Sequence, residues 1–225
     1  LKFKPTDSLS LSAVYRGEMR NHNLMDVTMT TGGEQGIGPI FIPTIAIHGY
    51  NWYKPHEVVL GASYTFKKKL LVGLDVAWMD YSKAKTLMVI YEFDVPEWLR
   101  VALSMVNAPP PDFHDIFVPR IGVEYTINEH VAVRSGYFYK PSPVPDQTGS
   151  NNYADANRHG VSAGVGVSFH APWGLLEKPI NIDAVFQAQI LEHRSVVKED
   201  PNDPAGNYAI DGEIFLGGIF LRHIY

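Results

Sequence analysis

The feature that most limits how this chain can fold is a period-two alternation of apolar and polar residues, which recurs along most of its length. In residues 57–66, for example, the apolar set Val58, Leu60, Ala62, Tyr64 and Phe66 alternates with Val59, Gly61, Ser63 and Thr65. Successive side chains of a β-strand point to opposite faces, so the pattern predicts strands that each have one apolar face. We expect eight of these strands, at residues 8–16, 57–66, 70–78, 120–127, 131–139, 160–169, 180–190 and 215–225.

The connections between these segments alternate between short and long. Lys67–Lys69 and Asn128–His130 are short, whereas residues 83–112, 141–157 and 195–206 form long stretches rich in Pro, Asn, Asp and Ser. Outer-membrane barrels have short periplasmic turns, long external loops and strands of about 10 residues. The sequence therefore predicts an all-β fold, an antiparallel transmembrane β-barrel, with residues 1–225 in one barrel domain. A soluble β-sandwich or a lipocalin-like binder is the alternative, but it gives no reason for the alternation.

The composition agrees with a barrel that a hydropathy scan would overlook. Mean hydropathy is −0.09, and no apolar stretch approaches the roughly 18 residues that a transmembrane helix needs. In a barrel only every second strand residue faces lipid, so its average hydropathy stays near neutral. Aromatic residues make up 12% of the chain, including 12 Tyr, which suits the aromatic girdles of such barrels.

Some segments fit the pattern less clearly. Residues 22–31 and 40–50 form either one external hairpin or extensions of neighbouring strands, and residues 95–106 could form a short amphipathic helix in an external loop. The glycine-rich run 32–38 lacks the Lys-Ser/Thr of a phosphate-binding loop, and we interpret it as a flexible external loop. Residues 1–4 resemble the end of a strand whose beginning is missing, so we expect this to be part of a longer barrel.

Several classes of function find no support. The net charge is −5 and basic residues are scattered, so no nucleic-acid partner is expected. The absence of cysteine excludes disulfides, thiolate zinc sites and thiol nucleophiles. The nine histidines form no H-E-x-x-H run, so we expect neither a metal site nor a cofactor. No G-x-S-x-G or clear triad spacing occurs, so we expect no catalytic residues, with a lipid-acting outer-membrane enzyme as the alternative.

Four stretches resemble a known family. They are Pro55 with Leu60–Tyr64; Asp75–Ser82; Phe113–Asp115 with Arg120–Tyr125; and a series made of Arg134–Tyr137, Ser142–Asp146, Asp155–His159 and Ser162–Gly164. In their order and spacing these stretches are similar to the FadL family of long-chain fatty acid transporters in the outer membrane of Gram-negative bacteria. The similarity covers the whole chain and is strongest over residues 113–169.

The resemblance implies a 14-stranded barrel with an N-terminal plug, from which hydrophobic substrates leave sideways into the membrane. The eight strands would be the last eight of that barrel, and the plug and first six strands would lie outside this sequence. The implied partners are a long-chain fatty acid or another hydrophobic small molecule, outer-membrane lipid, and the missing N-terminal part of the barrel.

A fatty-acid site needs apolar surface for the tail and a cation or hydrogen-bond donor for the carboxylate. Arg120 and Arg134 fall on the inward face and are the candidate cations, and Phe138 and Met79 are the candidate apolar contacts. The family has a basic residue near the position of His114. Because His114 is an imidazole, carboxylate binding there would depend on pH.

These residues also have structural interpretations. Arg120 and Arg134 could form salt bridges with inward acids such as Glu124 or Asp183, because barrel interiors are normally filled by ion-pair networks. Asp155 with Arg158 is expected to order an external loop. A water-filled porin is a further alternative, although inward apolar residues such as Leu71, Val185, Phe138 and Met79 favour an apolar passage.

Overall fold

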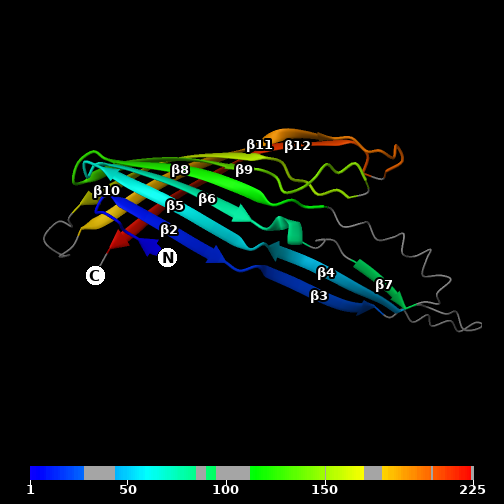
Figure 1. Cartoon of the computed structure of the whole chain (residues 1–225). Helices are drawn as coiled ribbons and strands as arrows, with labels where there is room; N and C mark the ends of the chain where they lie inside the picture. Colours follow the sequence, from blue (N-terminus) through cyan, green and yellow to red (C-terminus); the bar gives the residue numbers. More distant parts are fainter. Residues whose placement is uncertain are drawn as a thin grey trace, which may run out of the picture.

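The structure is a computed structural model, which describes residues 1–27, 44–84, 90–94, 112–149, 151–169, 179–203 and 205–223. Nine strands form one antiparallel sheet in the order β1-β2-β5-β6-β8-β9-β10-β11-β12 (Figure 1). Their bounds are β1 (Lys2–Phe3), β2 (Leu9–Arg16), β5 (Glu57–Phe66), β6 (Leu70–Met79), β8 (Ile116–Thr126), β9 (Val131–Lys140), β10 (Arg158–Phe169), β11 (Ile180–Val196) and β12 (Tyr208–His223). Among the described residues, no helix is long and apolar enough to cross a membrane.

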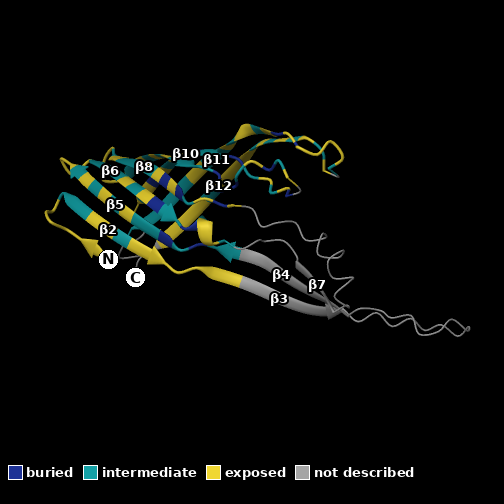
Figure 2. Ribbon diagram, turned by 45° about the vertical axis from the view of Figure 1, so that its right-hand side comes forward, coloured by how far each residue is buried: buried dark blue, intermediate teal, exposed yellow. Residues whose placement is uncertain are grey.

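All eight strands predicted from the alternation are present in this sheet. Most keep the expected length, whereas β11 and β12 extend to 17 and 16 residues at the end that carries the long connections. Neighbouring strands in the sheet order are also neighbours in sequence, except where β3, β4 and β7 intervene. The described strands form an open, curved sheet whose two edges are β1 and β12, so the chain supplies one wall rather than a closed barrel (Figures 1 and 2).

The register separates the two faces of this wall as the alternation predicts. The face that the alternation predicts to point outward carries large apolar side chains that remain exposed, among them Leu60, Leu74, Phe117, Phe215 and Ile219. Monomeric soluble proteins seldom expose so continuous an apolar surface, whereas a barrel wall presents one to lipid. Figure 2 shows the same alternation as bands of exposed and less exposed residues along each strand.

A smaller sheet extends the wall at the end with the long connections. It consists of β3 (Met19–Val27), β4 (Thr44–Lys54) and β7 (Ile90–Asp94), in the order β3-β4-β7 (Figure 1). β3 and β4 pair antiparallel just beyond the last pair of β2 and β5, so their described residues extend those strands, whereas residues 28–43 lie outside the described residues. The glycine-rich run 32–38, the expected helix at 95–106 and the final Tyr225 lie outside the described residues.

The two expected short turns are present and lie at the same end of the sheet. Lys67 and Lys68 adopt φ of 47° and 59°, and the Lys69 amide donates to the Phe66 carbonyl at 2.9 Å. Positive φ at both central residues defines the type I′ turn that suits the twist of a two-strand hairpin. The second short turn is closed by Asn128, whose side chain accepts from the amides of His130 and Val131.

Candidate functional site

The inward face of the wall carries two groups of paired charges. The first is centred on Arg134 of β9, which hydrogen-bonds Glu124 on β8 at 2.5 Å and Asp183 on β11. Glu124 lies directly opposite Arg134 in the register. Asp183 is two strands away from Arg134, and the guanidinium reaches it over Gly166 of β10. A Cβ at Gly166 would lie 2.6 Å from Asp183 Oδ1 and 3.0 Å from Arg134 Nη1, so only glycine leaves room for this bridge.

The second group is centred on Glu57, a buried carboxylate at the start of β5. It accepts from Arg16 at 3.0 Å and lies 3.8 Å from Arg120, which in turn lies 3.5 Å from Asp75. Both arginines that the sequence suggested for carboxylate binding therefore have acidic partners within the wall. The structural interpretation, that they pair with inward acids, is confirmed by these contacts.

Between the two charged groups runs a row of small residues that crosses the sheet from strand to strand. Successive register partners along it are Ser10, Ser63, Gly73, Gly122, Gly136 and Ser162. A hollow of about 430 Å³ lies over the middle of this row, and it is bordered by Leu71 and Val185 and, on one side, by Arg134 and Glu124 of the first charged group. We call it the furrow. Because glycine and serine project so little, the inward surface here is hollowed and offers mostly apolar atoms.

Phe138 and Met79, the apolar contacts expected from the sequence, both lie on the inward face but not together. The Phe138 ring lies against the backbone of Gly160 on β10, where an added Cβ would be 2.0 Å from the ring. Met79 lies at the end of β6 nearest the long connections and packs on the small cluster of Ala77, Ile116 and Val118. Neither residue borders the furrow, and their roles in ligand binding stay predictions.

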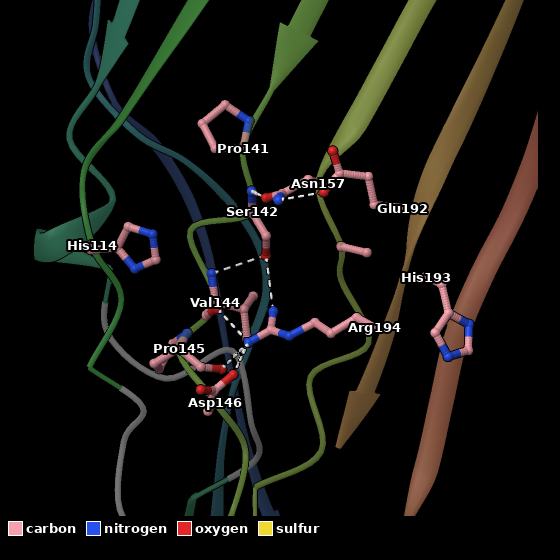
Figure 3. Close-up of a pocket in the computed structure, with 11 residues that line it drawn as sticks. His114, Pro141, Ser142, Val144, Pro145, Asp146, Asn157, Glu192, His193 and Arg194 are labelled. Carbon is pink, nitrogen blue, oxygen red and sulfur yellow. Dashed lines mark hydrogen bonds and ion pairs between the residues drawn. The ribbon is translucent and has the colours of Figure 1, made fainter.

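A second hollow, of about 410 Å³, lies at the end of the wall that carries the long connections (Figure 3). We call it the mouth pocket. It is bordered by His114, by the segment Pro141–Asp146 with Ala156 and Asn157, and by Glu192, His193 and Arg194 of β11. The sequence stretches that resemble the FadL family at His114, Ser142–Asp146 and Asn157 thus come together around one hollow.

Arg194 holds the walls of this pocket, and no pattern in the sequence pointed to it. Its guanidinium donates to the carbonyls of Val144 at 3.0 Å and Pro145 at 2.7 Å, to the carbonyl of Asp155 at 3.1 Å, and to the carboxylate of Asp146 at 3.1 Å. Figure 3 shows the guanidinium pointing into the bend that these residues form. An arginine with several donors can hold an irregular segment in one shape, and this cation is therefore fully occupied.

His114, the third candidate for carboxylate binding, borders the mouth pocket from the opposite side. Its amide donates to the Pro143 carbonyl at 3.1 Å, which ties the start of β8 to the proline-containing segment. His114 is exposed, and Figure 3 shows its ring at the edge of the pocket, away from Arg194. The structure thus separates His114 from Arg120 and Arg134, which lie further down the wall.

Asp155 and Arg158, which we expect to order an external loop, contact different parts of the wall. Asp155 accepts from the Ser142 hydroxyl at 2.9 Å, and Arg158 donates to Gln189 on β11 at 3.2 Å. Arg158 lies on the inward face of β10 and follows the register toward β11. Their role in ordering the loop stays a prediction.

One further group of side chains lies near the adjoining ends of β11 and β12, and it includes His193 at the border of the mouth pocket. His193 contacts the carboxylate of Asp211 through Nδ1 and the hydroxyl of Ser195 through Nε2, both at 3.0 Å. This order of groups is that of a Ser-His-Asp triad, which the sequence spacing did not reveal. The side chains of His193 and Asp211 are 62% and 67% exposed, however, so solvent screens the contact that would orient the ring.

Comparison with known proteins places this wall in a family. The family model described as outer membrane protein transport protein (OMPP1/FadL/TodX) matches residues 1–214. The chain belongs to this family. Its fold is accordingly part of a transmembrane β-barrel, as the sequence predicted.

Individual relatives agree with this assignment. The alkane uptake protein A of Marinobacter nauticus is 33% identical over 113 residues, which cover 49% of this chain and 25% of that protein. The crystal structure of a Pseudomonas aeruginosa FadL homologue matches with a TM-score of 0.64 at 16% identity, over 98% of this chain and 49% of the other. The P. putida toluene transporter TodX matches with a TM-score of 0.55 at 17% identity, over 97% and 45%. The chain thus spans half or less of the length of these relatives.

Proposed function

We propose that the protein is an outer-membrane channel for hydrophobic compounds, and that this chain forms the part of its wall along which the compound passes. The observation that carries the proposal is the furrow, an apolar hollow of about 430 Å³ on the inward face of a wall whose outward face is also apolar. Each methylene that leaves water there would contribute roughly 0.8 kcal/mol. Membership of the transport family and the relationship to an alkane uptake protein support the same function.

The charges of the wall favour an uncharged compound over a fatty acid. A fatty-acid carboxylate that binds Arg134 would have to displace Glu124 or Asp183, and one that binds Arg120 would compete with Asp75 and Glu57. An alkane or another hydrocarbon carries no charge, so its binding displaces none of these acids. We therefore propose hydrocarbons as the preferred class and long-chain fatty acids as the alternative, with lateral release into the membrane as the family resemblance implies.

A substitution at Gly122 tests the furrow directly. A Cβ added there meets no atom within 4 Å, so Gly122→Leu fits the fold and fills the furrow. The matched control is Val133→Leu, which changes an exposed outward residue of the neighbouring strand β9 that does not border the furrow. In cells that depend on this protein, uptake of a radiolabelled long-chain alkane and of the carboxylic acid of equal chain length would be compared. We expect Gly122→Leu to slow alkane uptake about tenfold and Val133→Leu to leave it unchanged. Equal uptake by both variants would contradict a passage along this furrow.

The contact between Ser195, His193 and Asp211 gives the second candidate, an outer-membrane enzyme that hydrolyses lipid esters. The high exposure of the group argues against an activated serine. Labelling of the purified protein with a fluorophosphonate probe tests whether Ser195 is an activated nucleophile. The transport proposal expects no labelling, whereas labelling that disappears in Ser195→Ala would establish the enzyme.

A further inference from the structure

The most unusual buried group outside the furrow and the mouth pocket is the ammonium of Lys198. Lys198 follows β11, and only 7% of its surface is exposed. Its Nζ donates to the carbonyls of Gln147 at 2.8 Å, Gly149 at 2.5 Å and Asn151 at 2.8 Å. An ammonium has three N–H donors, so these three bonds use all of them.

The acceptors are uncharged main-chain carbonyls, and their oxygen atoms, the negative ends of the carbonyl dipoles, converge on one point. Such an arrangement is unfavourable when nothing positive occupies the centre, because the carbonyl dipoles repel one another and lose their contact with water. The Tyr208 ring, whose centroid lies 5.7 Å from Nζ, adds a face that also favours a cation. The surroundings of Nζ therefore resemble a site for a monovalent cation, in which carbonyl oxygens replace the hydration shell.

The site joins the two long connections at the mouth of the wall. The carbonyls belong to Gln147, Gly149 and Asn151, which follow the Ser142–Asp146 side of the mouth pocket in sequence. The lysine belongs to the β11–β12 connection, where its own amide donates to Asn207 at 2.8 Å and the Glu199 amide donates to Thr148 at 3.0 Å. We propose that Lys198 is a covalently attached monovalent cation that fixes the carbonyls of Gln147, Gly149 and Asn151, and that its removal leaves a binding site for a free cation such as K⁺ or ammonium.

The proposal predicts chemical rescue, and the cysteine-free chain allows a clean measurement. Ala154 is exposed and lies just beyond the carbonyl site, so Ala154→Cys carries a spin label without a competing thiol. In that background Lys198→Ala opens the site, whereas Lys198→Met fills it with an uncharged side chain of similar length. Heat-dependent migration on electrophoresis would verify that each variant has folded.

We expect both variants to mobilise the label, with the ordered population falling about tenfold in Lys198→Ala. Potassium, ammonium or methylammonium would restore order in Lys198→Ala but not in Lys198→Met, and choline at the same ionic strength would restore neither. An immobile label in Lys198→Ala, a lack of rescue by all three cations, or equal rescue by choline would each overturn the proposal. The measurement uses no transported compound, so its outcome is independent of the uptake proposal.

Discussion

Replacement of Arg134 by methionine would separate the structural role of the inward charges from a role in binding. Methionine keeps much of the length of the side chain but removes the donors to Glu124 and Asp183. A hydrogen bond to a charged group contributes about 1.5–3 kcal/mol when it is well protected from water. The side chains of Arg134, Glu124 and Asp183 are 37%, 35% and 20% exposed, so screening reduces each contribution toward the range of about 0–1 kcal/mol found at surfaces. For the two bonds together we expect a loss of about 1–3 kcal/mol.

The assay is denaturant unfolding of the protein in detergent, followed by tryptophan fluorescence, together with binding of an alkane and of a fatty acid. The variant that combines Arg134→Met with Glu124→Gln and Asp183→Asn should recover most of the lost stability, since no unpaired carboxylate then remains. We expect alkane binding to persist in both variants. If Arg134→Met kept its full stability and lost only fatty-acid affinity, the arginine would be a ligand for carboxylates, and the preference for uncharged compounds would be refuted.

Two further predictions concern close packing and acid. Gly160→Ala places a methyl group where the Phe138 ring lies 2.0 Å away, so the ring must move, and we expect a loss of about 1–3 kcal/mol in the same unfolding assay; Gly160→Ala combined with Phe138→Leu should recover part of it. The hydrogen bond from Lys83 lowers the pKa of the buried Asp80 carboxyl below its ordinary value of 3.8. The contact between Lys83 and Asp80 therefore stabilises the fold fully at pH values above 3.8, and this stabilisation is lost as the pH falls through the lower pKa of the folded state. The rate of proteolysis between β6 and β8 should therefore rise only below about pH 4 in the native protein, and Asp80→Asn should abolish this dependence on pH.

The strands and their faces could be predicted because both depend on local chemistry. A residue on a barrel strand faces either lipid or the interior, and this choice fixes its polarity without reference to distant parts of the chain. The pairing of Arg134 with Glu124 was within reach for the same reason, since both are inward residues on strands joined by a short turn.

Arg194 was missed because the alternation breaks just before it. A register shift between Leu191 and Arg194 sets two residues of β11 opposite one residue of β12. Counting by twos from the outward Ile190 would place Arg194 outward, whereas the bulge turns it inward to the mouth pocket. Lys198 lies beyond the last strand residue, where no alternation applies, and its acceptors are main-chain carbonyls that carry no sequence signal.

In the proposed channel, the two charged groups would allow a wall rich in polar residues to pass a hydrophobic compound. The inward face needs polar groups near its ends and wherever water enters, yet an unpaired charge would bind water or anions and obstruct an apolar passage. Arg134 and Arg120 are each neutralised by acids of the same wall, one group on either side of the small-residue row. Gly166 is essential to this arrangement because the bridge from Arg134 to Asp183 passes over it. The furrow then presents mostly backbone, glycine and aliphatic atoms, with the paired Arg134 and Glu124 at its border. In the proposed channel, selectivity would arise as much from which charges are paired as from which residues are apolar.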